Sequence, residues 1–445
     1  MATGNNKDSK GIRHIGLHQT GLRSTPMLDE ETPFKTMMAS FDEAARRIGL
    51  QDQQYKLLRK PDREIAVVVP VKMDDGSLRL LDGYRIQHNA GLGPFLGPLR
   101  VDGELKITEL RALAAWMTWK CALLGIPFGG ASGGVVVDRH TLSASELERV
   151  VRRWTANMLG DIGPDRDVLA PEFADDADLM AWALDTMAGH TDGAANSAVT
   201  GKPREMGGSA CHEDAVAMGL RVILRVAASH FGLGPKGGLS VVIQGAGVVG
   251  GNLARILHAE GHRVVGLSDV YTQLHNPNGL DIPKLLAFRA KHGRLSDDTS
   301  DGTVVVEESD FLKLPCDVLA PCAVAMAVHS RNAEDIQARM IVEGAHGPVS
   351  PRADAILERR GIPVVPDILA NGGGVVVSYF EWIQNRTGYA WLEDVVAARL
   401  RRYMREAWDA TRATQLEYDC SLRAATHILA VKRVAEADAA RGVYA

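Results

Sequence analysis

The spacing of apolar residues predicts an ordered chain preceded by a short tail. Residues 1–30 are polar and show no periodicity, so we expect them to be disordered. A helical pattern starts near Pro33 and stops at Gly49. The valine-rich run Glu64–Val71 and the segment GYRIQHN from Gly83 are typical of two β-strands.

The segments that follow are predicted to be helical. Ile107–Leu124 is almost wholly apolar, which favours a helix that is buried on most sides. Ser143 followed by Glu146 is a capping-box pattern, and it predicts an amphipathic helix that ends near Gly160.

The pattern changes after about residue 200, where short apolar strands alternate with helices. Leu239–Ile243 is followed by a glycine-rich turn and a helix, and further apolar runs come after it: HRVVGLSD, CDVLAP, RMIVEG and IPVVPD. Such alternation predicts a parallel sheet covered on both faces. Beyond Asn371 the chain becomes helical to its end. The fold class is therefore α/β, and a length of 445 residues predicts two domains.

Composition narrows the functional classes. With 46% hydrophobic and 24% charged residues, the chain has the profile of a water-soluble globular protein. A net charge of −5 gives no basic face, which argues against nucleic acid and anionic membranes as partners. The chain has neither a bilayer-length apolar run nor a signal peptide, so we expect a cytoplasmic location. The 5 cysteines form no CxxC pair, which predicts reduced thiols and no metal site.

A glycine-rich turn in QGAGVVGGN carries the first candidate chemistry. Gly245, Gly247 and Gly250 form GxGxxG after a strand, and Val248 begins the next helix. Such glycines permit a tight turn and let the backbone approach a pyrophosphate. Asp269 ends the next strand, where an acid can hydrogen-bond a ribose hydroxyl, and it favours NAD over NADP. The pattern predicts a Rossmann domain that binds NAD(P); the alternative is one that keeps these glycines for packing alone.

Five segments resemble those of glutamate dehydrogenases and of the related leucine, phenylalanine and valine dehydrogenases. They are GYRIQHN, LAAWMTWKCALLGIPFGG, VTGKP, VEGAHGP and DILANGGGVVVSYFEW, and they occur in order over nearly the whole chain. The resemblance implies a substrate-binding and oligomerisation domain at 31–198 plus 375–445, with a Rossmann domain at 199–374 inserted between. It also implies a homo- or hetero-hexamer that binds a small amino acid in a cleft between the domains.

The family reaction transfers a hydride from the α-carbon of an amino acid to a nicotinamide and then hydrolyses the iminium to a 2-oxo acid and ammonia. The resemblance makes Lys120 the cation that holds the α-carboxylate. A lysine in so apolar a helix needs an anion nearby, although it could instead snorkel from the helix face. Ser378 matches a serine that lines the side-chain pocket, or is an ordinary helix serine. Asn371 also matches the family's substrate site.

One departure from the family concerns substrate choice. Glutamate enzymes carry a lysine for the side-chain carboxylate in GPxKGG, and Leu96 takes that place in GPFLGP. An apolar residue cannot compensate for the desolvation of a second carboxylate. Leu96 therefore favours an apolar amino acid such as leucine. Pro98 replaces a glycine of the same motif and stiffens the loop.

The departures at the chemical centre are larger. The family pattern FGGAKGG contains the catalytic acid–base lysine, and Ser132 replaces it in FGGASGG. A serine hydroxyl does not titrate near neutral pH and reaches less far than an ammonium, so it cannot replace the lysine in proton transfer. Glu172 stands where the family has its catalytic aspartate, and its extra methylene displaces the carboxylate.

Three positions on the cofactor side differ as well. In GGSACHEDAVAMG, His212 and Val216 replace an arginine and a threonine that contact the cofactor in the family, and His346 replaces an asparagine in VEGAHGP. Val216 cannot supply the expected hydroxyl hydrogen bond. The two histidines could titrate near neutrality and form a new catalytic pair, but histidines at such positions are more often structural.

These residues support three functional hypotheses. The leading one is a catalytically silent regulatory or assembly subunit that binds an apolar amino acid through Lys120 and pairs with an active dehydrogenase. The second is a working NAD(P)-dependent amino acid dehydrogenase with an unusual substrate. The third is a dinucleotide-sensing protein without an amino-acid ligand.

Overall fold

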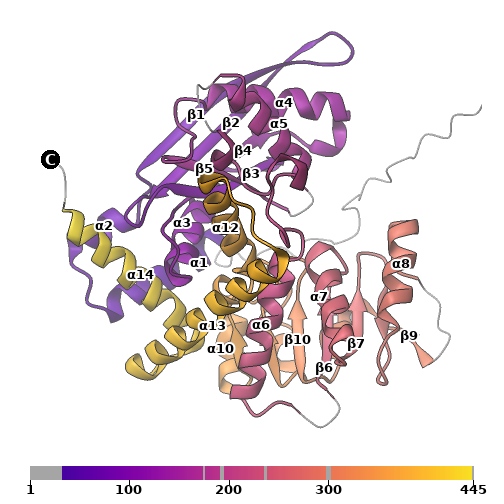
Figure 1. The fold of residues 1–445 in the computed structure, drawn as a ribbon. Helices are drawn as coiled ribbons and strands as arrows, with labels where there is room; N and C mark the ends of the chain where they lie inside the picture. Colours follow the sequence, from indigo (N-terminus) through magenta and orange to yellow (C-terminus); the bar gives the residue numbers. More distant parts are fainter. Residues whose placement is uncertain (1–32, 174–175, 191–194, 235–237, 297–301, 443–445) are drawn as a thin grey trace, which may run out of the picture.

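The chain forms two α/β domains, each built on its own sheet (Figure 1). The computed structural model describes residues 33–173, 176–190, 195–234, 238–296 and 302–442, and the predicted N-terminal tail lies outside them. The first sheet lies in the indigo and purple part of the chain, and the second lies in the pink and orange part. No helix within the described segments is long and apolar enough to cross a membrane.

The first domain contains a mixed five-stranded sheet with the strand order β1-β2-β4-β3-β5. Strands β1 and β2 are antiparallel, β2 is antiparallel to β4, and β3 runs parallel to both β4 and β5. The elements are α1 (Pro33–Arg47), α2 (Asp52–Leu58), β1 (Arg63–Lys72), β2 (Leu78–Asn89), β3 (Phe95–Asp102), α3 (Ile107–Leu123), β4 (Gly129–Val136), α4 (Ala144–Asn157), β5 (Asp167–Pro171) and α5 (Ala177–Ala188).

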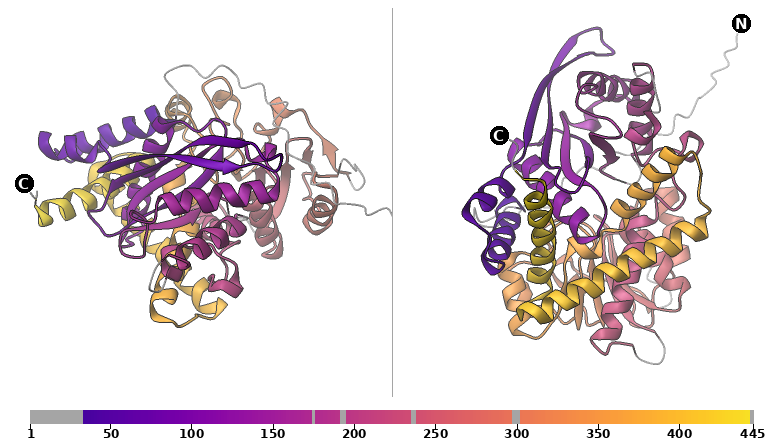
Figure 2. Two further views of the ribbon diagram at one scale, coloured as in Figure 1. Left: turned by 90° about the horizontal axis from the view of Figure 1, so that it is seen from above. Right: turned by 60° about the vertical axis from the view of Figure 1, so that its left-hand side comes forward.

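The elements predicted for this domain are confirmed, with one change of length. The capping box of α4 is present, since Ser143 accepts from the Glu146 amide and the Glu146 side chain accepts from the Ser143 amide. Strand β2 begins at Leu78, five residues before the predicted Gly83. The added residues belong to a hairpin with β1 that extends beyond the body of the domain (Figure 2).

The two faces of the first sheet are covered by different helices. On one face, Leu99 and Val135 belong to an apolar cluster with residues of α4 and α5. On the other face, Ile86 of β2 packs against Leu110 and Ala114 of α3. Helix α3 also packs against α1 and α14 (Leu422–Arg441), which explains why it is apolar on nearly every side.

The second domain contains a seven-stranded sheet with the order β12-β11-β10-β6-β7-β8-β9. Strands β12, β11, β10, β6 and β7 are parallel, as the alternation of strands and helices predicted. The elements are α6 (Ala215–His230), β6 (Ser240–Gln244), α7 (Val248–Ala259), β7 (Arg263–Ser268), β8 (Gln273–His275), α8 (Ile282–His292), β9 (Val304–Val305), α9 (Glu308–Phe311), β10 (Val318–Pro321), β11 (Met340–Val342), α10 (Pro351–Arg359) and β12 (Val364–Val365).

Strands β8 and β9 correct the expectation of a wholly parallel sheet. Both run antiparallel to their neighbours at one edge. The chain passes from β7 to β8 through a short turn, which leaves no room for the crossover that a parallel strand needs. Asp269 stabilises this turn because its carboxylate accepts hydrogen bonds from the amides of Tyr271 and Thr272, both at 2.8 Å.

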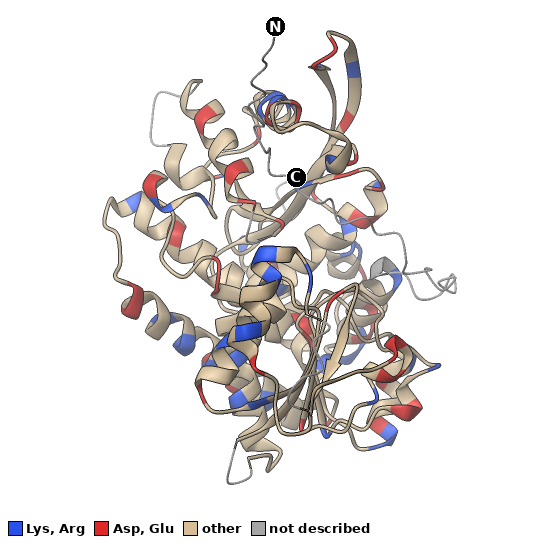
Figure 3. Ribbon diagram, turned by 90° about the vertical axis from the view of Figure 1, so that its right-hand side faces the viewer, with Lys and Arg blue, Asp and Glu red and all other residues tan. Residues whose placement is uncertain are grey.

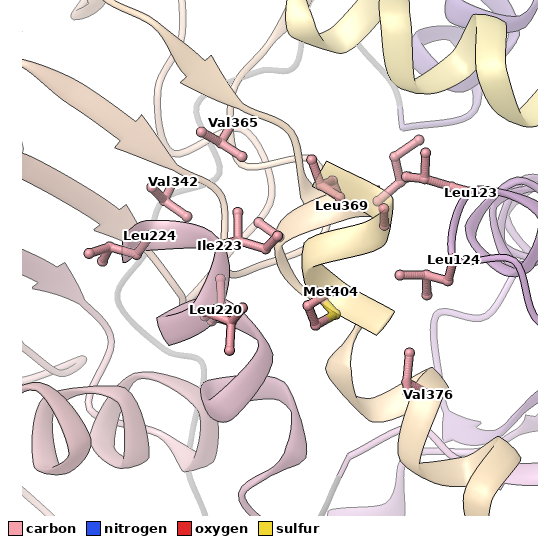
Figure 4. Packing of buried hydrophobic residues seen from close by; sticks show 14 of the residues in the cluster. Leu123, Leu124, Leu220, Ile223, Leu224, Val342, Val365, Leu369, Val376 and Met404 are labelled. Carbon is pink, nitrogen blue, oxygen red and sulfur yellow. The ribbon is translucent and has the colours of Figure 1, made fainter. Parts of the chain in front are cut away.

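The C-terminal helices join the two domains through a shared apolar core. They are α11 (Asp367–Ala370), α12 (Gly373–Thr387), α13 (Glu393–Tyr418) and α14. Helix α13 packs against α6 of the second domain, whereas α14 returns to α1 and α3 of the first. Figure 4 shows Leu123 and Leu124 of the α3 end facing the same core as Leu220 of α6 and Val342 of β11. The core therefore fixes α3 against the second domain.

Charged residues of both signs are interspersed over the side of the molecule that Figure 3 shows. The pair Arg85–Asp167 is completely buried. Arg85 of β2 donates to Asp167 of β5 from both Nε and Nη2, and neither side chain is exposed. Gln87 donates to the same carboxylate at 2.9 Å. This pair links strands that are separated by two others in the sheet.

The Arg85–Asp167 pair gives a test of this packing. Asp167→Ala leaves the Arg85 guanidinium buried without a counter-charge, so the free energy of unfolding should fall by about 3–5 kcal/mol. The control is Asp161→Ala, which removes the carboxylate that Arg63 contacts at the surface and should cost about 1 kcal/mol or less. Urea denaturation measures both. Equal effects of the two substitutions would contradict the structure.

Candidate functional site

The glycine-rich turn between β6 and α7 has the geometry of a dinucleotide site. Gly245 has a φ of +95°, which an L side chain rarely adopts. A Cβ at Gly250 would lie 1.9 Å from the carbonyl oxygen of Gly245, so this glycine is required for helix–strand packing. A Cβ at Gly247 would meet nothing within 4 Å. Gly247 is the N-cap residue of α7, which begins at Val248, and it has no side chain that could cap the helix. The space beside Gly247, at the uncapped start of α7, leaves room for a ligand, which fits a pyrophosphate.

Asp269 follows β7 as predicted, but the structure gives its carboxylate a second role. Oδ1 accepts from the turn amides of Tyr271 and Thr272, and Oδ2 accepts from the amide of Leu295 at 2.5 Å. A carboxylate has about four acceptor sites, so one remains for a ribose hydroxyl. The residue is therefore a turn-forming acid as well as the candidate ribose ligand.

Lys120 lies where the two domains meet. The residue is 3% exposed, and its ammonium donates to Oδ1 of Asn371 at 2.8 Å. The amide of Asn371 in turn donates to the carbonyl of Ala345 at 3.3 Å, in the loop after β11. Burial lowers the pKa of Lys120, and the nearby carboxylate of Asp367 opposes that shift. The ammonium is thus a desolvated cation with a single hydrogen-bond partner among the described residues.

His346 lies in the same loop, close to this cation. The loop is held by Asp367, whose Oδ2 accepts from the amide of Gly347 at 2.9 Å. The His346 side chain is exposed to solvent. Desolvation, reinforced by the positive charge of Lys120, lowers the pKa of the imidazole. A neutral imidazole beside an ammonium can accept a hydrogen bond, but it adds no second cation to the site.

Two of the predicted residues, Leu96 and Ser132, share the sheet face that α3 covers. Ser132 of β4 pairs with Ile86, which packs against α3, and side chains of paired residues point to the same face. Leu96 of β3 pairs with Gly130, two residues from Ser132, so strand alternation places Leu96 on that face as well. Leu96 is 1% exposed and belongs to the shared core. The Ser132 side chain is fully buried, and its Oγ has no hydrogen-bond partner.

Glu172 follows β5 and faces Arg100 of β3. Its Oε1 lies 3.5 Å from Nε of Arg100, and Arg100 also donates to Glu109 of α3 at 2.9 Å. Burial raises the pKa of the Glu172 carboxyl, whereas the guanidinium of Arg100 and, more weakly, the ammonium of Lys120 lower it. Glu172 therefore belongs to the same electrostatic neighbourhood as Lys120, but its closest cation is Arg100.

The structure places His212 next to a buried ion pair. Lys202 donates to Oε1 of Glu381 at 2.7 Å, and neither side chain is exposed. Nδ1 of His212 lies 3.6 Å from the other oxygen of Glu381 and has no hydrogen-bond partner. Burial lowers the pKa of this histidine. A Cβ at Gly201 would lie 2.9 Å from Nε2 of His212 and 2.5 Å from the Pro171 ring, so the histidine lies beside the strand that leads to Glu172.

The remaining predicted residues are buried in α6 and α12 or lie at their contact. Val216 of α6 approaches Gly374 of α12, where an added Cβ would lie 3.1 Å from the valine Cγ2. Ser378 of α12 is 4% exposed. No polar contact within the described residues joins Ser378 to Lys120, so its role in a side-chain pocket stays a prediction. The described residues also contain no cluster of metal-ligating side chains.

Sequence reasoning missed two charged residues of this site, Arg100 and Asp367. Arg100 pairs with Glu172, and Asp367 holds the loop that carries His346. A signal existed for each. Arg100 interrupts an apolar strand, and Asp367 forms a Pro-Asp pair four residues before the predicted Asn371. A charged residue within a buried run needs a partner, so both could have been named as site candidates.

The chain matches two family models that together cover most of its length. Residues 61–189 match the model for the Glu/Leu/Phe/Val dehydrogenase dimerisation domain, and residues 207–442 match the Glutamate/Leucine/Phenylalanine/Valine dehydrogenase model. A glutamate dehydrogenase of Thermotoga maritima is 41% identical over 94% of this chain and 100% of its own length. A catabolic NAD-specific glutamate dehydrogenase of Bacillus subtilis is 37% identical over 92% of this chain and 96% of its own length.

The fold is also found in solved structures. A hetero-hexameric glutamate dehydrogenase from Thermus thermophilus, in a leucine-bound form, has a TM-score of 0.89 and 35% identity. The match covers 94% of this chain and 99% of that chain. A glutamate dehydrogenase from Peptoniphilus asaccharolyticus has a TM-score of 0.81 and 31% identity over 93% of this chain and 100% of that chain.

The glycine turn gives a prediction that separates packing from ligand approach. Gly250→Ala forces a Cβ against the Gly245 carbonyl, so it should lower the free energy of unfolding by about 1–3 kcal/mol. Gly247→Ala adds a methyl group to open space at a φ of −68°, so stability should change by no more than about 0.5 kcal/mol. Thermal unfolding of the two variants measures the difference. The reverse order of stabilities would show that the turn has another geometry.

Proposed function

Because the chain belongs to the Glu/Leu/Phe/Val dehydrogenase family, we propose that it is a glutamate dehydrogenase-like subunit with impaired catalysis that regulates or completes an assembly with an active relative. One observation carries this proposal. Ser132, at the position of the family's acid–base lysine, presents a buried hydroxyl without a partner on the sheet face that α3 covers. A hydroxyl cannot move protons there near neutral pH.

The neighbouring titratable groups do not replace the missing amine. Burial raises the pKa of the Glu172 carboxyl, the nearby guanidinium of Arg100 lowers it, and this contact at 3.5 Å pairs the carboxyl with a cation other than Lys120. Lys120 also carries an amine near Glu172, and it is the group that we expect to hold the α-carboxylate of the ligand. If it held the carboxylate, it could not at the same time act as the general base. This division of roles supports impaired turnover.

The ligand that these residues favour is an apolar amino acid. The Lys120 ammonium has one neutral hydrogen-bond acceptor, Asn371, so a carboxylate would improve its environment. Leu96 is buried in the apolar core and offers nothing to a second carboxylate. The relatives are named for glutamate, which carries a second carboxylate in its side chain. Leu96 is the residue that argues for a ligand with an apolar side chain in this protein.

We propose that the chain retains NAD(P) binding, with NAD favoured. Gly247 and the uncapped start of α7 would hold the pyrophosphate, and Asp269 has one acceptor site left for the ribose. A bound nicotinamide would accept a hydride, and all proton transfers would fall to the side chains of the chain. The Lys120–Asn371 hydrogen bond supports this proposal, because it joins the two domains next to the expected ligand site.

The assembly we propose is a cytoplasmic hexamer that contains an active paralogue. The match of residues 61–189 to a dimerisation domain supports self-association of the first domain. The hetero-hexameric Thermus relative, described with leucine bound, supports a mixed assembly that responds to an apolar amino acid. All 5 cysteines are free thiols, which fits a reducing compartment.

A second candidate function is an active amino acid dehydrogenase with an unusual substrate. The observation that favours it is Glu172, a carboxyl whose pKa is raised by burial within reach of the charge of Lys120. Such a carboxyl could take part in proton transfer if substrate displaced Arg100 from it. The open glycine turn is compatible with this function and with the leading proposal.

Steady-state assays separate the two functions. The purified chain, tested alone with a panel of amino acids and with NAD or NADP, should show no turnover at the scale of about 1–1,000 per second that is usual for enzymes. Residual activity of Ser132→Ala should equal that of the unmodified chain, because the hydroxyl has no part in proton transfer. Robust turnover would instead establish the second function, and an unchanged rate in Ser132→Ala would then remove Ser132 from the mechanism.

The amino-acid site can be tested by calorimetry with L-leucine. Lys120→Met removes the ammonium but keeps the length of the side chain, so leucine affinity should fall by about tenfold or more while stability is unchanged or higher. Lys106→Met, at the exposed start of the same helix, is the matched control and should bind leucine normally. Equal affinities of the two variants would remove Lys120 from the site.

A further inference from the structure

Helix α14, yellow in Figure 1, contacts both sides of the junction at which Lys120 meets Asn371. It packs against α3 of the first domain and against β12 of the second. Two arginines of this helix hold the backbone segments that form the junction. Arg423 lies in its first turn and reaches the second domain, whereas Arg433 lies further along and reaches the end of α3.

Arg433 holds the end of the helix that carries Lys120. Its Nη1 donates to the carbonyl oxygens of Ala122 at 2.7 Å and of Leu123 at 2.9 Å. The last carbonyls of a helix lack partners within the helix and carry partial negative charge, so a guanidinium stabilises them. Lys120 belongs to the same last turn of α3. The contact therefore restrains the backbone from which the ammonium extends.

Arg423 holds the start of the loop 343–347, which follows β11. Its Nη2 donates to Oε1 of Glu343 at 2.7 Å, and its Nη1 donates to Oε2 at 3.1 Å. Nε donates to Asp354 of α10 at 2.9 Å. The Glu343 side chain is not exposed at all. A two-point pair of this kind fixes orientation as well as distance, so it ties the first turn of α14 to the second domain.

The restraint continues from Glu343 to the rest of the loop. Oε2 of Glu343 also accepts from the amide of Asp367 at 2.8 Å, and Asp367 accepts from the amide of Gly347 at 2.9 Å. The loop is thus held at both ends. Between these ends, the carbonyl of Ala345 accepts from Asn371 at 3.3 Å. The partner of the Lys120 ammonium is therefore bound to a segment that Arg423 anchors.

We propose that Arg423 and Arg433 are positioning residues for the Lys120 site. Each acts through other residues: Arg433 through the end of α3, and Arg423 through the loop 343–347. Because both belong to one helix, they fix the two halves of the junction relative to each other before a ligand arrives. Such preorganisation raises the affinity for a ligand carboxylate. This inference rests on the proposed role of Lys120 as the cation that holds that carboxylate.

Positioning through α14 differs from a purely local role in what the loss of Arg433 disturbs. A local role affects the end of α3 alone. Positioning also loosens the loop 343–347, with which Arg433 makes no hydrogen bond or ion pair within the described residues. An effect on this loop therefore has to be transmitted along α14 to Arg423.

Amide hydrogen exchange of the full-length chain without ligand tests the proposal. Arg433→Met should speed exchange at the end of α3 and, by about tenfold, in the loop 343–347. Arg433→Lys keeps a cationic donor for the α3 carbonyls and should restore most of the protection. Lys432→Met is the matched control on the same helix, since its half-exposed ammonium lies 3.7 Å from Glu417 of α13. Both segments should exchange at the unmodified rate in this control.

Calorimetry with L-leucine gives the second measurement. Arg433→Met should weaken leucine binding by about tenfold, and so should the double variant Arg423→Met/Glu343→Gln. The double variant removes both charges of the buried pair together, so no unpaired charge remains, and it keeps an acceptor for the amide of Asp367. Lys432→Met should bind leucine like the unmodified chain.

The proposal is overturned if Arg433→Met leaves exchange in the loop 343–347 unchanged. It is also overturned if Arg433→Met binds leucine normally while Lys120→Met loses that binding. If the unmodified chain does not bind leucine, the proposed ligand is wrong, and the exchange rates still decide whether the two arginines position the junction. The proposed function and this inference can therefore fail separately.

Discussion

The arrangement of the site depends on one buried ammonium. Lys120 comes from a helix that is apolar on nearly all sides, so its charge cannot reach bulk water. Its ammonium is instead directed to Asn371, at the start of the C-terminal helices, and through it to the loop after β11. One hydrogen bond thus joins the first domain to the second at the point where a ligand carboxylate would be most stabilised. A neutral amide is a weak counterpart for a desolvated cation, which is why we expect an anion to bind there.

The glycine turn and the core around this ammonium follow the pattern expected for the family, whereas the residues at the expected acid–base positions differ from it. The glycine turn, the shared core and the buried pairs Arg85–Asp167 and Lys202–Glu381 fix the surroundings of Lys120, and under the proposed function they would position a ligand and a dinucleotide. At the centre, Ser132 supplies a hydroxyl where an amine is expected. Binding needs shape and fixed charge, whereas turnover also needs a group that titrates. Under the proposed function, a chain that has the binding groups and lacks the titratable amine would sense a ligand without turning it over.

The sequence predicted the fold well because the relevant signals are local. The apolar helix from Ile107, the capping box at Ser143 and the turn at Gly245 each depend on residues that are neighbours in the chain. The antiparallel edge of the second sheet was missed because β8 is only three residues long. In the predicted site, Lys120 and Asn371 are brought together across 251 positions.

Contacts of this range are not visible in local periodicity. Arg100 was missed for that reason, because its partner Glu172 comes after the end of β5, about 70 positions further along the chain.

The central claim is that position 132 lacks the titratable amine that amino acid oxidation requires. A single-turnover experiment tests it most directly. The purified chain, at a concentration comparable to that of NAD, is mixed with saturating L-leucine, and reduced nicotinamide is followed by absorbance from milliseconds to minutes. The account predicts no reduced nicotinamide above the level of a sample without protein. Formation of one equivalent per chain within seconds would contradict it.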